Sequence, residues 1–213
     1  MKIDGATVLV TGANRGLGRE FARQFARHGA SVCAGARDPL SITDPLVKPI
    51  QLDVTSQESV EIAVREAGDV SILINNAGVL GPDPRTEMDV NYFGPLRMID
   101  AFAPVLARNG GGAIVNVLSV LSFVGWPRAS GYAASKAAAW SLTKSTRQAL
   151  ASQGTLVVAV HAGFIDTDMA ADVDAPKITP ESVVAQVIEA LVLGRDEVLA
   201  DETSRAAKAG LVA

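Results

Sequence analysis

Short apolar runs that suit buried strands alternate along this chain with longer stretches that have helical spacing. The runs are Thr7–Val10, Ser31–Ala34, Ile50–Leu52, Ile72–Ile74, Ala113–Leu118 and Leu156–Val160, with Glu197–Ala200 as a candidate seventh. The helical stretches are Gly18–His28, Gln57–Ala67, Leu96–Arg108, Ser130–Ser152 and Pro180–Leu193. Strands that are apolar throughout are typical of a parallel sheet covered on both faces. We predict an α/β fold, a doubly wound parallel sheet of six to seven strands, in one domain over residues 1–213.

The composition argues against several functional classes. A net charge of −4 and a pI near 5.2 do not fit a nucleic-acid-binding protein, which usually carries a clustered basic face. The single cysteine, Cys33, excludes an intramolecular disulfide, and the first residues do not resemble a signal peptide. No apolar run reaches the ~18 residues of a membrane helix. We expect a cytoplasmic protein that binds neither nucleic acid nor membrane, without a metal site.

Three glycines, Gly12, Gly16 and Gly18, lie between the first apolar run and the first helical stretch. Glycine permits backbone torsions and close approaches that a Cβ blocks, and a helix N-terminus attracts a pyrophosphate. The sequence therefore predicts a dinucleotide site. The spacing Gly-x-x-x-Gly-x-Gly differs from the Gly-x-Gly-x-x-Gly motif, so a tight turn without a ligand is the alternative.

Two arginines indicate which dinucleotide is bound. Arg15 lies at the positive end of a helix, where a cation is unfavourable unless an anion binds nearby. Arg37 follows the second apolar run, where NAD-binding folds carry an acid for the ribose and NADP-binding folds an arginine. We predict NADP(H) as the preferred cofactor, with NAD(H) left open because Asp38 is a candidate ribose acid. The alternative is that both arginines are solvated surface residues.

A second constellation suits proton transfer. Tyr132 and Lys136 are four residues apart at the start of a helical stretch, so they share one face. A phenol with a pKa of ~10 is a weak acid–base catalyst unless a cation lowers that pKa, and Lys136 is placed to do so. Ser119 ends the fifth strand, where doubly wound sheets bind ligands. An amphipathic surface is the alternative for the Tyr-x-x-x-Lys pair alone.

These pieces together resemble the short-chain dehydrogenase/reductase family over nearly the whole chain. The matching motifs, in order, are Thr11–Gly18, Leu52–Thr55, Asn75–Gly78, Asn91, Ser119 and the Tyr132/Lys136 pair. The resemblance implies a Rossmann fold and an oxidoreductase that transfers a hydride between NADP(H) and a small carbonyl or alcohol substrate. It also implies a homodimer or homotetramer.

The resemblance assigns roles to individual residues. Tyr132 would be the acid/base, Lys136 would lower its pKa, Ser119 would polarise the carbonyl and Asn91 would hold a water for proton relay. Asp53 and Val54 would lie at the adenine, Asn76 at the adenosine ribose, and Ile165 and Thr167 at the carboxamide, whereas Asn75 would be structural. The implied cofactor-binding set is Gly12, Asn14, Arg15, Gly16, Leu17, Gly18, Arg37, Asp53, Val54, Asn76, Tyr132, Lys136, Ile165 and Thr167.

The chain also departs from the family pattern. Ala162 occupies the place of the usual proline, which predicts a looser turn, and His161 before it is expected to be structural. The connection from Gly78 to Asn91 is short for the family and leaves little room for the usual run into the fourth helix, which calls the position of Asn91 into question. A brief segment after Met169 predicts a small lid and an open pocket.

The remaining apolar residues admit two interpretations. An apolar substrate cleft or plain packing would explain the set Val120, Leu121, Phe123, Val124 and Trp126. Phe102 and Trp140 belong either to the core or to a subunit interface. For the whole chain, the alternatives to the oxidoreductase are a non-catalytic NADP(H)-binding sensor and an epimerase or dehydratase on nucleotide sugars. The latter usually needs a larger C-terminal domain.

Overall fold

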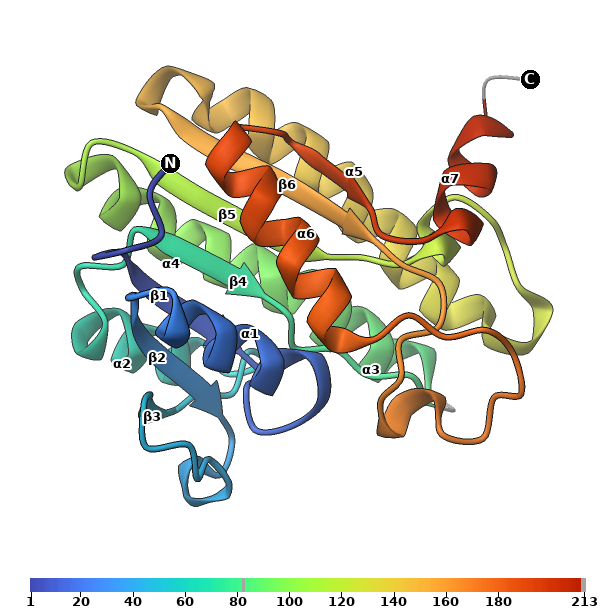
Figure 1. The fold of residues 1–213 in the computed structure, drawn as a ribbon, viewed down its shortest axis with the longest axis horizontal. Helices are drawn as coiled ribbons and strands as arrows, with labels where there is room; N and C mark the ends of the chain where they lie inside the picture. Colours follow the sequence, from blue (N-terminus) through green and yellow to red (C-terminus); the bar gives the residue numbers. More distant parts are fainter. Residues whose placement is uncertain (82, 212–213) are drawn as a thin grey trace.

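Seven strands form one parallel sheet in the computed structural model, which describes residues 1–81 and 83–211 (Figure 1). They are β1 (Thr7–Thr11), β2 (Ser31–Ala36), β3 (Lys48–Gln51), β4 (Ile72–Asn75), β5 (Gly112–Val117), β6 (Thr155–His161) and β7 (Glu197–Leu199). Their spatial order is β3-β2-β1-β4-β5-β6-β7. The chain reverses direction across the sheet between β1 and β4, and such a switch point is where doubly wound sheets bind ligands. The predicted doubly wound fold is confirmed.

Helices cover both faces of the sheet. They are α1 (Gly16–Arg27), α2 (Gln57–Glu66), α3 (Pro84–Met88), α4 (Gly94–Arg108), α5 (Ser130–Leu150), α6 (Pro180–Leu193) and α7 (Glu202–Ala209). Val8 and Val10 of β1 pack with Phe21 in the cluster that includes α1 and α6, while Leu9 packs with Phe102 in the cluster that includes α2 and α4. Figure 1 shows α1 and α6 together on the near face. This alternation explains why the consecutive residues Val8, Leu9 and Val10 are all apolar.

The helical segment that precedes β5 consists of α3, a π-helical turn and α4 together, and it is longer than its apolar spacing predicts. It begins at Pro84 rather than Leu96, because Asp83 accepts hydrogen bonds from the backbone amides of Arg85 and Thr86 at 3.2 and 3.1 Å. The five residues Asp89–Phe93 form a π-helical segment between α3 and α4. The short connection thus leaves room for a helix that runs through Asn91, and the expectation of too little room is wrong.

Most predicted elements are found with boundaries shifted by one or two residues. The predicted strand Ile50–Leu52 is Lys48–Gln51, with Pro49 tolerated because β3 is an edge strand. Phe102 is fully buried, so core packing is confirmed for this residue. The predicted domain 1–213 includes residues 82, 212 and 213, which lie outside the described residues. Within the described ranges, no helix is long and apolar enough to cross a membrane.

Candidate active site

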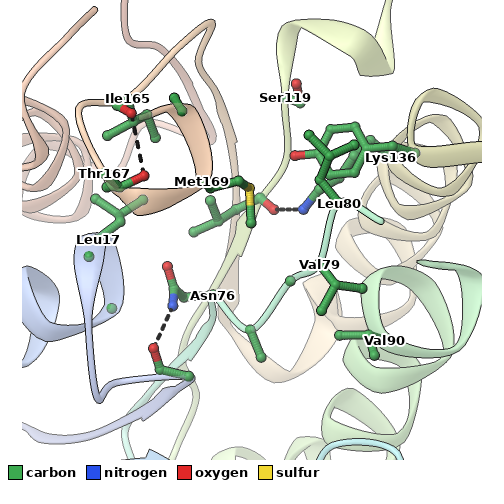
Figure 2. A pocket seen from close by; sticks show the side chains of 18 of the residues that line it. Leu17, Asn76, Val79, Leu80, Val90, Ser119, Lys136, Ile165, Thr167 and Met169 are labelled. Atoms are coloured by element: carbon green, nitrogen blue, oxygen red, sulfur yellow. Dashed lines mark hydrogen bonds between the residues drawn. The ribbon is translucent and has the colours of Figure 1, made fainter. Parts of the chain in front are cut away.

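A cavity of about 1270 Å³ opens at the carboxyl ends of β1 to β6. Ligand sites usually measure about 300–1,000 Å³, so there is room for a large cofactor and a small substrate together. Every predicted site residue except Asn91 lines this cavity. In Figure 2, Leu17 and Asn76 face Ser119 and Lys136 across it. The glycine loop and the group Ser119, Tyr132 and Lys136, which are far apart in the chain, therefore line the same cavity.

The glycine loop has the geometry of an anion cradle. Gly12 and Gly16 adopt φ angles of +65° and +52°, which side chains with a Cβ rarely adopt. A Cβ on Gly18 would overlap the carbonyl oxygen of Gly12, so α1 approaches β1 too closely for any other residue. The first turn of α1 carries no acidic residue, and Arg15 does not cap the helix with its side chain. The amides of this turn are thus suited to a pyrophosphate.

The two asparagines at the end of β4, Asn75 within the strand and Asn76 after it, support different parts of this architecture. Asn76 Nδ2 donates to the carbonyl oxygens of Thr11 and Gly12 at 2.9 and 3.2 Å, which fastens the glycine loop to β4. Its amide oxygen points into the cavity (Figure 2). Asn75 Nδ2 instead donates to buried Asn116 Oδ1 at 2.9 Å, as a structural residue does. Asn76 thus combines a structural contact with an acceptor free for a ligand.

The nucleotide end of the cavity holds a balanced set of charges. Arg15 lies 3.5 Å from Asp168, and with side chains 72% and 77% exposed this ion pair is weak. Burial disfavours ionisation of Asp53, but hydrogen bonds from Thr55 and the charge of Arg37 outweigh it and keep the pKa of Asp53 below its ordinary value. Asp53 is therefore an anionic hydrogen-bond acceptor, and the neighbouring Arg37 is a cation that can bind a phosphate.

The three groups expected to handle the substrate converge at the other end. Lys136 is 4% exposed; its Nζ donates to the carbonyl oxygen of Val117 at 2.9 Å and lies 5.6 Å from the centroid of the Tyr132 ring. Tyr132 is half-buried in the cavity wall. Burial raises the pKa of Tyr132 to about 12, although a hydrogen bond with Ser119 lowers it. Burial also lowers the pKa of Lys136 to about 8.

In this structure the pKa of Tyr132 is set by burial, Ser119 and Glu87, and the role of Lys136 in lowering that pKa stays a prediction. The ammonium is directed at a backbone carbonyl rather than the phenol oxygen, and the desolvation that lowers its own pKa also penalises the phenolate. In this structure Tyr132 is a neutral phenol at pH 7, which is the form that donates a proton.

Asn91 lies behind the cavity wall rather than on it. Its amide nitrogen donates to the carbonyl oxygen of Val79 at 2.9 Å and to Ser135 Oγ at 3.0 Å, while its amide oxygen accepts from the Val79 amide. Ser135 Oγ in turn donates to the carbonyl oxygen of Tyr132 at 2.8 Å. Asn91 thus supports the first turn of α5 through Ser135. Its role in holding a water stays a prediction.

The site includes a buried carboxylate that the sequence analysis did not single out. Glu87 is 2% exposed, and its Oε1 accepts a hydrogen bond from the Gly81 amide at 3.1 Å. Its Oε2 lies where a Cβ on Gly131 would stand, immediately before Tyr132 in the chain. The negative charge raises the pKa of Tyr132. Glu87 is four residues before Asn91, and that spacing is the sequence signal that places both on one helix face.

Comparisons with known proteins agree with this geometry. The family model for short chain dehydrogenases matches residues 6–177. The chain belongs to the short-chain dehydrogenase/reductase family. A short chain dehydrogenase of Monascus purpureus, mpl6, is 33% identical, with 86% of this chain and 76% of the relative covered. The 3-oxoacyl-(acyl-carrier-protein) reductase FabG of Staphylococcus aureus is 34% identical, with 76% of each covered.

Solved structures of the family match the whole fold. A short chain dehydrogenase from Burkholderia cenocepacia, in complex with NADP, superposes with a TM-score of 0.96 at 41% identity, covering 100% of this chain and 95% of the other. The predicted oxidoreductase class is confirmed by family membership. These three relatives are named as dehydrogenases or reductases, so the alternative of a non-catalytic sensor gains no support.

The turn after β6 is firmly held despite its departure from the family pattern. The carbonyl oxygen of Ala162 accepts from the Val120 amide at 2.8 Å, and the Gly163 amide donates to Asp201 Oδ2 at 2.6 Å. The expectation of a looser turn is wrong, because neighbouring segments bond this backbone from both sides. The turn places Thr167 beside the glycine loop, since a Cβ on Gly16 would lie 3.3 Å from Thr167 Cγ2, and Figure 2 shows Ile165 and Thr167 close to Leu17.

The apolar residues that follow Ser119 divide into two groups. Trp126 lines the cavity, as do Val120, Leu121 and Val124. Phe123 does not; it stacks on His161 with ring centroids 4.1 Å apart and meets Trp140 edge-on at 4.9 Å. The prediction of an apolar cleft is thus right for four residues and wrong for Phe123, which packs behind the wall.

His161 is structural, as expected. It is fully buried, its Nδ1 lies 3.3 Å from the carbonyl oxygen of Ser119, and burial lowers its pKa to about 4. The neutral ring therefore supports the backbone of Ser119 from behind.

Proposed function

We propose that this chain is an NADP(H)-preferring oxidoreductase that interconverts a small carbonyl compound and its alcohol, with Tyr132 as the acid/base. The observation that carries the proposal is that a single cavity holds both the glycine loop with Arg37 and the group Ser119, Tyr132 and Lys136. Neither constellation alone is specific. Their convergence supports a dinucleotide at one end and a reacting oxygen at the other.

The residues on the cavity wall suit the parts of NADP(H). The glycine loop would hold the pyrophosphate, Arg15 and Arg37 the 2′-phosphate, and Asp53 with Val54 the adenine. Asp38, the candidate ribose acid, accepts from the Leu40 amide at 3.0 Å and caps a short 3₁₀ turn, which favours NADP(H). The relative from Burkholderia cenocepacia is a complex with NADP, which agrees. Binding of NAD(H) is the weaker possibility.

Asn76 would lie at the adenosine ribose. At the nicotinamide end, Ile165 and Thr167 would hold the carboxamide and Lys136 the ribose. When bound, the nicotinamide supplies the hydride for reduction or accepts it in oxidation. The chain's own groups handle the proton and the oxygen. Tyr132, neutral at pH 7, donates its phenolic proton to the carbonyl oxygen, while the Ser119 hydroxyl holds that oxygen in place.

A titration with NADPH and NADH, followed by absorbance during incubation with aldehydes and ketones, tests the proposal. Tyr132→Phe is expected to lower kcat about 10²- to 10⁴-fold while the Kd for NADPH changes less than about twofold. The chain offers a matched control, since Tyr92 is its second tyrosine and does not line the cavity. Tyr92→Phe is expected to retain activity. Equal activity in both variants would refute the role of Tyr132, and failure to bind either cofactor would refute the whole proposal.

We also propose a homodimer or homotetramer in the cytoplasm. Trp140 supports an interface on α5: it is only partly buried and carries the ammonium of Lys144 4.0 Å from its ring centroid. Light scattering of the purified protein tests the assembly. A monomer at micromolar concentration would contradict it.

A further inference from the structure

The wall around Tyr132 is apolar, and part of it is open to solvent. The side chains come from loops after β4, β5 and β6, and are Leu80, Leu121, Val124, Trp126, Met169 and Val173. Four of them are large hydrophobic residues with high exposure: Leu80 44%, Val124 43%, Trp126 37% and Met169 51%. Trp126 also meets Phe164 edge-on, with centroids 6.3 Å apart. A contiguous exposed apolar surface beside reactive groups marks a ligand-binding surface.

The charged groups on the described cavity wall either lie at the nucleotide end or have a partner within the chain. Three of them, Arg37, Asp38 and Asp53, lie after β2 and β3 at the nucleotide end. The others each have a partner within the chain: Arg15 pairs with Asp168 at 3.5 Å, Asp89 with Arg97 at 2.9 Å, and Lys136 donates to the Val117 carbonyl at 2.9 Å. Lys136 is thus the cation nearest to Tyr132 on the described wall, 5.6 Å from the ring centroid, and a carboxylate or phosphate on the substrate would have to compete for it with the Val117 carbonyl oxygen.

We propose that the substrate is a neutral, apolar aldehyde or ketone, whose alkyl or aryl group packs against Leu80, Trp126 and Met169 while its oxygen meets Ser119 and Tyr132. This inference rests on the proposed function and specifies its substrate class. A sugar is disfavoured because its hydroxyls would be buried against side chains that cannot accept or donate hydrogen bonds. A charged oxo acid is disfavoured because its anion would lie against apolar side chains, while the Lys136 ammonium already donates to the Val117 carbonyl oxygen.

A homologous series of unbranched aldehydes from three to eight carbons tests the inference, with NADPH oxidation as the readout. Burial of one methylene group favours binding enough to raise kcat/KM about fourfold for each added carbon, until the wall is covered. A polyhydroxylated aldehyde and a 2-oxo acid of matched length are expected to react at least about 100-fold more slowly. A flat series, or preference for either polar compound, would overturn the substrate class.

Matched leucine variants localise the effect. Leu80→Ser is expected to reduce kcat/KM for the eight-carbon aldehyde about tenfold and that for the three-carbon aldehyde less than twofold. Leu193→Ser is the control, because Leu193 is 55% exposed at the end of α6 and does not line the cavity. If Leu80→Ser does not fold, Met169→Ser serves in its place.

The outcomes separate the two levels of the proposal. Equal losses for short and long aldehydes in the variant would overturn the apolar contact while the oxidoreductase function stands. NADPH binding that is unaccompanied by turnover of any carbonyl compound would overturn the proposed function itself, and the substrate class with it.

Discussion

Replacing Arg37 by alanine is expected to weaken NADPH binding about tenfold and to leave NADH binding within about twofold. A hydrogen bond to a charged group contributes roughly 1.5–3 kcal/mol, which corresponds to about 10- to 150-fold in Kd. The lower end applies because Arg37 is exposed and its interaction with a phosphate is screened by solvent. Removal of Arg37 also takes away one of the two cations that lower the pKa of Asp53, the other being Arg97, so the repulsion between Asp53 and the phosphate grows.

The assay is a titration of nicotinamide fluorescence with each cofactor at low and at physiological salt. The wild-type Kd for NADPH is expected to rise with salt more steeply than that of Arg37→Ala, because one charge contact is missing in the variant. Arg195→Ala is the control: Arg195 is 61% exposed and pairs with Glu189 at 3.4 Å, away from the cavity wall. Unchanged NADPH affinity, or an equal loss for both cofactors, would refute the phosphate role of Arg37.

Three further predictions concern packing and pH. Gly18→Ala places a methyl group against the backbone of the glycine loop. Urea unfolding is therefore expected to show a free energy of unfolding lower by about 1–3 kcal/mol, and titration with NADPH a higher Kd. Unchanged values would contradict the close packing. His161 has a folded-state pKa of about 4 against an ordinary 6.5, so the unfolded chain binds its proton first and stability falls as pH drops from 6.5 to 4. This fall, on the order of 3 kcal/mol, is expected to be absent in His161→Phe and retained in His28→Phe, by urea unfolding at each pH. Glu87→Gln removes the negative charge that raises the pKa of Tyr132, so the rise of kcat/KM for alcohol oxidation is expected at lower pH; an unshifted pH profile would exclude an effect of that charge.

Local patterns were sufficient to predict most of the fold. The strands and long helices follow from apolar spacing, because the spacing of apolar residues within an element reflects its own geometry and does not depend on which element packs against it. The start of α3 was also readable but was missed. Asp83 followed by Pro84 is a helix N-cap with proline in the first turn, and that signal outweighs the lack of apolar periodicity before Leu96.

The site could be predicted only as far as each residue's role is local. The cavity brings together Arg15 and Asp168, or Tyr132 and Leu80, through contacts between segments far apart in the chain. The pKa of Tyr132 has the same origin, because burial and Glu87 come from tertiary packing that the Tyr-x-x-x-Lys spacing does not contain. For the same reason the sequence alone could not show that Phe123 packs behind the cavity wall while Leu121 and Val124 line it.

The π-helical segment Asp89–Phe93 lies between two fixed contacts, which constrains the length of the helical segment for protein engineering. Asn91 is fixed on one side by Val79 and Ser135, and Gly94 on the other by Val54, which lies 2.9 Å from where a Cβ of Gly94 would be. One residue turns an α-helix by about 100°, so a one-residue deletion between these anchors cannot keep both contacts. A deletion here is therefore expected to lose one of the two contacts, whereas length changes beyond Arg108, at the exposed end of α4, are not subject to this geometric restriction.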